Sequence, residues 1–466
     1  MVSPTRPLIS RFARTALAAV LTAGLTLPAA PAAAQGEAIS LLRDTEIEAI
    51  LHDDAAPLFD AAGLDAKSIN ILLIGGSDLQ AFAAPGTMAV YTGLILESKT
   101  PNELQGVMAH EIGHLAGGHS ARSGEMNSAG MKPFLLTMGL GVLAALAGNA
   151  TAGAVLAGNA GYFGTLGAMG YSREQESRAD QAGATYLERA GLSGRGLAEF
   201  FDNFRYQEVF QEAKRYPYFR THPLSSDRIE ALRARVEKQA HYAVADSAEA
   251  QAKHEIMKAK LQGFINPNIA IVKCGDKVQT YPTKYACAIA YYQLKEPEKA
   301  LARIDALLQE QPDNPYLWEL KGQILFEFGR TAEAEAPQRK SVELKPDAPL
   351  LRVNLGQTLI ALTDKAKIEE GVRELKRSLD QDGDNAVAWR LLAEAYATQG
   401  HDGLARYATA EYNDRIGDKR QALIFAMRAR DMLDKGSPEW RRATDIAHTS
   451  DPDRDISRGL DKDDRL

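Results

Sequence analysis

The sequence predicts a mainly α protein in two parts: a helical domain that contains a small β-sheet, and an α-solenoid of short helical repeats. Three observations predict this fold. Apolar residues recur at helical spacing in several long segments of the 466-residue chain. Two short segments, 71–74 and 88–94, have the apolar character of strands. In the C-terminal part a proline–aspartate turn at 312–313 recurs 34 residues later, at 346–347.

Composition and charge narrow the class of protein. The chain is 45% hydrophobic and 25% charged, which excludes global disorder, and its formal net charge of −7 argues against nucleic acid as a partner. Residues 1–34 contain three arginines, a short apolar run and small residues before Gln35, the pattern of a signal peptide. We therefore expect an exported protein. In an oxidising compartment Cys274 and Cys287 can form a disulfide, and two small buried side chains are the alternative.

The first part of the mature chain predicts a helix followed by a small sheet. The spacing of apolar residues predicts helix over most of 35–65. The apolar run Ile71–Ile74 predicts a strand that ends at a glycine pair. Phe82–Gly86 has the composition of a turn, and Met88–Leu94 predicts a second strand.

A helix with metal-binding character follows the sheet. Residues 100–103 supply the capping threonine, the early proline and the glutamate of a helix start. The helix carries His110 and His114, which lie on one face because they are four residues apart. Zinc suits two imidazoles and a carboxylate, with a fourth position left for water. Glu111 is then the expected general base beside that water.

The third ligand is expected in a charged helical segment downstream. Glu176 and Asp180 are four residues apart, so that both lie on one helical face. A glutamate there can bind the ion, and Asp180 can hold a ligand histidine through its distal ring nitrogen. Spacing alone leaves Glu174 as a competing ligand. The structural alternative is a solvated charge cluster at a helix start.

These two motifs together resemble a known enzyme family. The pattern HExxH, followed by Ser-Arg-x-x-Glu-x-x-Ala-Asp from residue 172, is similar to zinc metallopeptidases of the HtpX and CAAX-prenyl-protease type. The resemblance implies that His110, His114 and Glu176 bind one zinc ion per chain. It also implies Glu111 as the base and Asp180 as the acid behind the ligands. It implies a mainly helical, zincin-like metallopeptidase domain with a small sheet.

Two further segments resemble blocks of this family. Gln80–Gly86 is similar to the family's Asn-Ala-Phe-Ala-x-Pro-Gly segment, with glutamine in place of asparagine. The second block is Thr221-His222-Pro223 with Arg228. His222 can donate to the oxyanion of the reaction, or it can bind zinc as a fourth ligand and keep the enzyme latent. Capping of the next helix is the structural alternative. We expect an extended substrate to add to the strand 88–94 by main-chain hydrogen bonds.

No charged residue appears between Lys132 and Arg173, a stretch that separates the two halves of the metal motif. Residues 131–170 are rich in glycine, alanine and leucine, but polar residues and glycines keep the longest clean run below the ~20 residues that a bilayer needs. We expect interior helices or an apolar lid over the cleft. Contact with a membrane through this stretch is the alternative.

The C-terminal half changes character. Residues 241–262 predict a linker helix, and 263–447 predict paired helices at the 34-residue period of the tetratricopeptide repeat. Trp318 and Gly329 recur 71 residues later as tryptophan and glycine, which supports the repeat. Stacked units of this kind offer a concave surface for a client or partner. Residues 448–466 are charged and poor in apolar residues, and we expect a disordered tail.

The sequence therefore predicts that residues 35–240 form a secreted zinc endopeptidase domain. With a signal peptide and repeats, the layout is similar to periplasmic members of the family, which implies action on misassembled outer-membrane proteins and contact with their assembly machinery. The alternative is a repeat-based chaperone or assembly adaptor whose zinc site is latent or structural. Glu111 favours the enzyme, because a structural site needs no general base.

Overall fold

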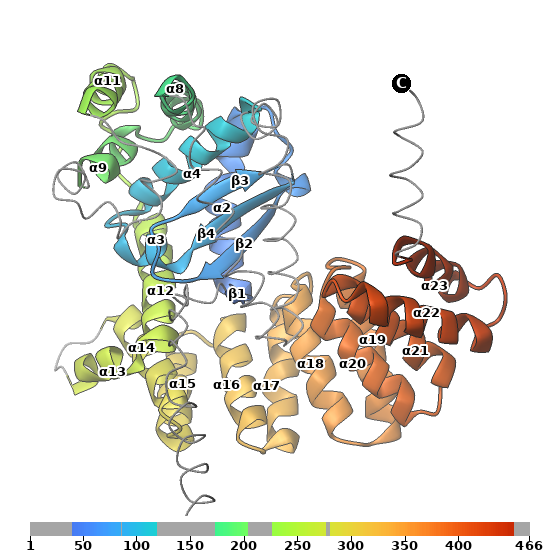
Figure 1. Ribbon diagram of the computed structural model, residues 1–466. Coiled ribbons are helices and arrows are strands. Elements are labelled where there is room, and N and C mark those ends of the chain that lie inside the picture. The colour runs from blue at the N-terminus through green and yellow to red at the C-terminus, as the bar shows by residue number, and fades with distance from the viewer. Residues whose placement is uncertain (1–39, 85, 119–172, 204–225, 276–279, 452–466) are drawn as a thin grey trace, which may run out of the picture. The chain divides into compact units, whose positions relative to one another are not determined.

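The computed structural model describes residues 40–84, 86–118, 173–203, 226–275 and 280–451 (Figure 1). The expected signal peptide at 1–34, the stretch 131–170, His222 and residues 452–466 of the expected tail lie outside the described residues. Within them the predicted fold class is confirmed. Helices predominate, a small sheet lies in the N-terminal part, and helical repeats follow.

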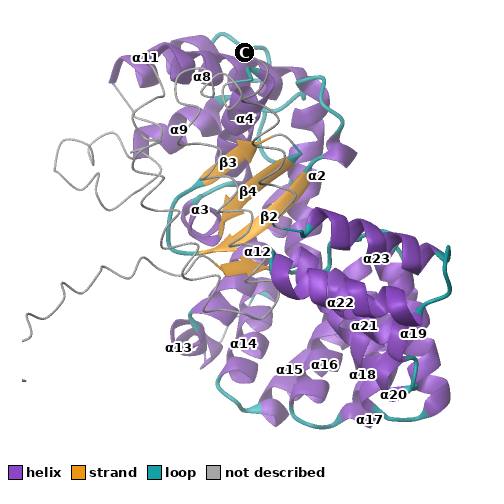
Figure 2. Cartoon of the chain, turned by 45° about the vertical axis from the view of Figure 1, so that its right-hand side comes forward, coloured by secondary structure: helices purple, strands orange, loops and turns teal. Residues whose placement is uncertain are grey.

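The described sheet has four strands in the order β1-β2-β4-β3, and Figure 2 shows β2, β4 and β3 side by side. β2 and β4 are parallel, and the two outer strands pair antiparallel to them. Because side chains alternate along a strand, Leu73, Met88 and Val90 enter the main core, and Ile74 and Tyr91 lie on the opposite face. The strands are β1 (Ser40–Leu42), β2 (Asn70–Gly75), β3 (Ala81–Ala84) and β4 (Thr87–Tyr91).

Two expectations about the start of the domain were wrong in part. The helix predicted over 35–65 is preceded by β1, and α2 (Thr45–Ala61) begins only after Asp44. Asp44 sets this start, because its carboxylate accepts the first free N–H groups of the helix. The segment 82–86, expected to be a turn, is mostly strand β3, since its residues pair with β4. The turn itself is left to the end of that segment, where Gly86 has a φ of 77°.

The predicted strand 88–94 is too long. It ends at Tyr91, and the chain continues as the short helix α3 (Thr92–Glu97). The hydroxyl of Thr92 and the N–H of Gly93 both bond to the backbone of Gly76, which turns the chain out of the sheet. β4 is also paired on both sides, with β2 and with β3. A substrate therefore has no free edge there, and the expectation that it adds to this strand was wrong.

Helix α4 (Pro101–Ala116) is central to the N-terminal part and packs against α2, α8, α9 and β3. The predicted helix start is confirmed, because the side chain of Thr100 accepts the N–H of Glu103 at 3.1 Å. Leu104, Val107 and Met108 are fully buried in the main core. The remaining helices of this part are η1 (Ala66–Ser68), α8 (Arg173–Arg189), α9 (Arg195–Asn203), α11 (Ser226–Val236) and α12 (Ala248–Ile265).

Helix α12, where the linker was expected, packs with one face against the N-terminal part and with another against α14 (Tyr281–Gln293), a helix of the C-terminal part. Met257 and Leu261 lie in the main core together with residues of α4. Ala259, on another face, packs with Ala286 and Ala290 of α14. The helix therefore contributes to two hydrophobic clusters, the main core of the N-terminal part and the cluster with α14.

The repeats have the predicted internal similarity. Trp318 and Trp389 each donate the indole N–H to a carbonyl six residues upstream. Gly329 and Gly400 follow the ends of corresponding helices with φ values of 78° and 76°. The shared spacing thus has a shared structural cause. The helices after α14 are α15 (Pro297–Glu310), α16 (Pro315–Glu327), α17 (Thr331–Leu344), α18 (Pro349–Ala361), α19 (Lys365–Leu379), α20 (Ala386–Thr398), α21 (Asp402–Arg415), α22 (Lys419–Met432) and α23 (Pro438–Thr449).

A disulfide joins Cys274 to Cys287, so that of the two alternatives for the cysteines the structure has the pair. The bond links η3 (Ile271–Gly275), which follows the short helix α13 (Pro267–Ala270), to α14. In the part of the chain that the structure describes, no helix combines the length and the apolar character that crossing a membrane requires.

Candidate metal centre

Two histidines of α4 face α8 from consecutive helical turns. His110 is fully buried and His114 is 2% exposed, because α4 is covered on every side along almost its whole length. Glycines let the two helices approach. A Cβ atom at Gly113 would lie 2.7 Å from the carbonyl oxygen of Ala179, and one at Gly183 would lie 3.0 Å from the backbone nitrogen of His110. At Gly113 a side chain would force a backbone shift, and at Gly183 it would make an unusually tight contact, so these glycines allow α8 to lie close to the histidines.

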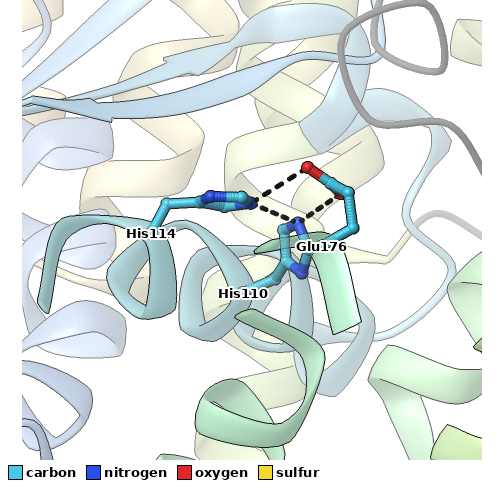
Figure 3. A group of neighbouring side chains, drawn as sticks. All are labelled: His110, His114 and Glu176. Atoms are coloured by element: carbon cyan, nitrogen blue, oxygen red, sulfur yellow. Dashed lines mark hydrogen bonds and ion pairs between the residues drawn. The ribbon is translucent and has the colours of Figure 1, made fainter. Parts of the chain in front are cut away.

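Glu176 of α8 completes a group of three (Figure 3). The Nε2 atoms of His110 and His114 are 3.1 Å apart. The carboxylate of Glu176 places one oxygen 3.4 Å from His114 Nε2 and the other 3.6 Å from His110 Nε2. Ligands at about 2.1 Å from a tetrahedral ion stand about 3.4 Å from one another. The three donors are therefore spaced as the ligands of one small ion would be, and two imidazoles with one carboxylate are a zinc-type donor set.

Asp180 lies behind the first histidine. Its Oδ1 is 2.9 Å from Nδ1 of His110, so that the Nε2 atom of the same ring is turned toward Glu176. Burial lowers the pKa of His110, but hydrogen bonding to Asp180 and Glu176 outweighs burial and raises this pKa to about 10. The carboxylates thus orient the ring and make it more basic, which is what outer carboxylates do for ligand histidines.

The structure brings most of the predicted site residues together. His110, His114 and Glu176 form the group, Asp180 contacts it, and Glu111, next to His110 on α4, is buried with 2% exposure. His222 lies outside the described residues, as does the side chain of the competing glutamate at 174.

Two residues at the site received no role from sequence reasoning. The ring of Phe201 lies edge-on to His110, with centroids 5.6 Å apart. Arg228 of α11 contacts both Asp180 and Glu176. The signal for Arg228 was charge compensation, since buried carboxylates such as Glu176 and Asp180 require cationic partners. The family block that begins at Thr221 included this arginine but gave it no role.

Comparison with known proteins agrees with this geometry. Residues 41–236 match peptidase family M48, and residues 302–420 match the TPR domain of cytochrome c-type biogenesis protein H. The putative beta-barrel assembly-enhancing protease of Vibrio cholerae is 26% identical over 390 residues, which cover 81% of this chain and 78% of that protein. The beta-barrel assembly-enhancing protease of Escherichia coli is 25% identical over 385 residues, 80% and 76% of the two chains. The metalloprotease LoiP of E. coli is 32% identical over 175 residues, 37% and 65%.

The fold, the site and these relatives define an enzyme of the zinc metalloprotease class that is joined to helical repeats. More closely, the chain carries a peptidase family M48 domain at 41–236, followed by a tetratricopeptide-repeat domain. The predicted family resemblance and the predicted enzyme class are both confirmed.

Proposed function

We propose that this protein is a periplasmic zinc endopeptidase that removes misassembled outer-membrane proteins and uses its repeats to bind clients or their assembly machinery. The observation that carries the proposal is the buried convergence of His110, His114 and Glu176. The names of the relatives, beta-barrel assembly-enhancing proteases that match across most of the chain, support the class of client. The signal-peptide pattern at 1–34 supports export.

The proposed chemistry assigns one role to each residue. Bound zinc supplies a Lewis acid for the scissile carbonyl and lowers the pKa of a water molecule. Glu111 accepts a proton from the attacking water and passes it to the leaving amine. Asp180 keeps the ring of His110 in the tautomer that presents Nε2 to the site, as the 2.9 Å contact indicates. His222 remains a candidate for oxyanion stabilisation or for a fourth ligand in a latent state.

Burial of the site favours catalysis over adventitious metal binding. His110, Glu111 and Glu176 are each at most 2% exposed, and exposed acidic clusters do not have this character. In a site of low water content, charge interactions with the reacting groups are stronger than at the surface. A buried glutamate next to a histidine of the group suits a general base and has no purpose in a purely structural site.

The decisive experiment replaces the general base. Glu111→Gln keeps the size and most of the hydrogen bonding of the side chain, so we expect the variant to fold and to retain one zinc per chain. Casein cleavage by the mature protein should fall at least ~1,000-fold, because the proton acceptor is lost. A chelator should abolish cleavage by the unaltered protein, and added zinc should restore it. Undiminished cleavage by Glu111→Gln would eliminate the proposed mechanism.

A further inference from the structure

An arginine outside the ligand set is buried at the metal centre. The side chain of Arg228 is 6% exposed. Its Nε and Nη2 donate to the two oxygens of Asp180, each at 2.9 Å. Its third nitrogen, Nη1, lies 3.2 Å from Oε2 of Glu176. One guanidinium therefore holds two carboxylates that stand one turn apart on α8.

The two oxygens of the Glu176 carboxylate have different partners. Oε2 faces the guanidinium, and Oε1 lies 3.4 Å from Nε2 of His114. The glutamate is thus oriented by a partner that is not itself a metal ligand. The same guanidinium orients Asp180, whose Oδ1 contacts Nδ1 of His110. The arginine reaches two members of the ligand set, one directly and one through Asp180.

The surroundings of Arg228 fix its position. The guanidinium carbon lies 5.8 Å from the centre of the Phe201 ring, and that ring in turn packs edge-on against His110. Burying a carboxylate without a counterion is costly, and here Glu176 and Asp180 share one. Arginine suits this place because its planar fork can bond two carboxylates at set angles, whereas lysine presents a single point charge.

We propose that Arg228 is a positioning residue of the metal centre, which holds Glu176 and Asp180 in the arrangement that zinc requires before the ion binds. The inference rests on the proposed function, since it assigns the arginine to a zinc site. Preorganisation raises affinity because the ligands need not be ordered when the ion arrives. The role is distinct from ligation and from proton transfer, and it connects α11 to the ligand set.

The test compares two arginines of the same helix. Arg228→Lys and Arg228→Gln remove the fork, and Arg235→Gln removes a similar link, because Arg235 also bonds α8, through Gln181 and Thr185 at 2.7 Å each. In the full mature chain, zinc affinity is measured by competition with a chelator. We expect a loss of ~10–100-fold for both Arg228 variants, the range for partners that support ligands. For Arg235→Gln we expect a change below about twofold. Unaltered zinc affinity in the Arg228 variants would overturn the proposal.

A spectroscopic measurement separates positioning from general stability. At saturating cobalt(II), the visible absorption bands report the coordination geometry. They should shift in Arg228→Lys and stay unchanged in Arg235→Gln, even if both variants lose stability. Identical spectra for the Arg228 variant and the unaltered protein would contradict the inference. If Arg228→Gln does not fold, as judged by circular dichroism of the metal-free protein, Arg228→Lys carries the test because it keeps the charge.

Two controls keep the proposals apart. If the unaltered protein binds no zinc, the proposed function fails, and the positioning role that rests on it fails as well. If it binds zinc and cleaves casein while the Arg228 variants do the same with equal affinity, only the positioning role fails. In an Asp180→Asn background, Arg228→Gln should reduce zinc affinity less than it does alone, because one of the two groups through which it acts has already changed. Fully additive losses would place the action of Arg228 elsewhere.

Discussion

At the scale of single residues, the metal centre depends on a glycine without a side chain as much as on its ligands. Gly113 stands between the two histidines of α4, and the backbone of Ala179 fills the space where a side chain would begin. Backbone atoms cannot rotate away, so any larger residue must push α8 from α4. Glu176 and Asp180 would move with α8, because both lie on that helix within one turn of Ala179.

Gly113→Ala therefore tests whether helix spacing controls metal binding. We expect the free energy of unfolding to fall by about 1–3 kcal/mol, the usual range for overpacking, although alanine is the better helix former. Zinc affinity should fall as well. Gly106→Ala is the matched control, because its Cβ would lie 2.7 Å from the backbone of Leu197 on α9, away from the ligands. Chemical denaturation and chelator competition measure both effects. Equal zinc affinity in the two variants would contradict the argument.

At the scale of elements, a buried lysine joins α12 to the start of α2. Lys260 is 3% exposed, and its Nζ lies 2.8 Å from Oδ1 of Asp44 and 3.1 Å from Oε2 of Glu46. Asp44 is the residue that caps α2. Glu46 also accepts the hydroxyl of Tyr285 at 3.1 Å. One ammonium group thus compensates two carboxylates at a helix start.

Lys260→Met should destabilise the protein strongly. Removal of one partner leaves buried carboxylates without their cation, which costs about 3–5 kcal/mol in comparable cases. Lys253→Met, on the same helix, is the control, since Lys253 pairs with the largely exposed Asp53 and Glu249 and should cost less than about 1 kcal/mol. The double variant Lys260→Met/Glu46→Gln should recover part of the loss. Equal urea midpoints for the two single variants would refute the role of the buried lysine.

At the scale of the whole molecule, this charge cluster extends into the repeats. Glu319 of α16 accepts hydrogen bonds from Asn354 at 3.0 Å and from Thr45 at 3.4 Å. Burial raises the pKa of Glu319, Lys260 opposes this, and Asp44 and Glu46 add to the rise, so that the pKa reaches about 8. An acid whose pKa is higher in the folded state stabilises the fold at low pH. That contribution is complete below the unfolded pKa, near 4.5, and is lost as the pH rises through about 8.

The pH dependence of unfolding measures this contribution. Between pH 5 and pH 9 the free energy of unfolding should decrease, with a share on the order of 1–2 kcal/mol from Glu319 after allowance for its contact with solvent. Glu319→Gln keeps an acceptor for Asn354 and should flatten the curve and raise stability at pH 9. Glu327→Gln, on the same helix, serves as the control. If the curves of Glu319→Gln and the unaltered protein run parallel, the carboxyl does not titrate as described.

The sequence predicted what is periodic or chemically distinctive. The capped start of α4, the spacing of His110 and His114 and the repeat of Trp318 depend on local patterns, and all of them appear in the structure. Pairing partners were not predictable in this way. Alternation alone could not show that β4 is enclosed between β2 and β3, or that residues after Tyr91 leave the sheet. Strand order depends on contacts that a single segment does not encode.

The same limit applies to the site. The donor types and their spacing suggested which residues could meet, but from spacing alone two glutamates were equivalent, and the family resemblance was needed to choose between them. Arg228 required knowledge of which helix lies across from α8, because its role comes from two carboxylates about 50 positions earlier in the chain. Long-range compensation of charge has no local pattern.

Because α12 packs against both the main core and α14, it limits where the chain can be cut to give a stable fragment. The part that matches the peptidase family ends at residue 236, yet Met257 and Leu261 lie in the same core as residues of α4, the helix that carries the two histidines. A fragment that ends at the family boundary would lack Met257 and Leu261 and would expose the core that they fill. The smallest self-sufficient protease therefore has to include α12, whose other side then needs α14 to shield it from water.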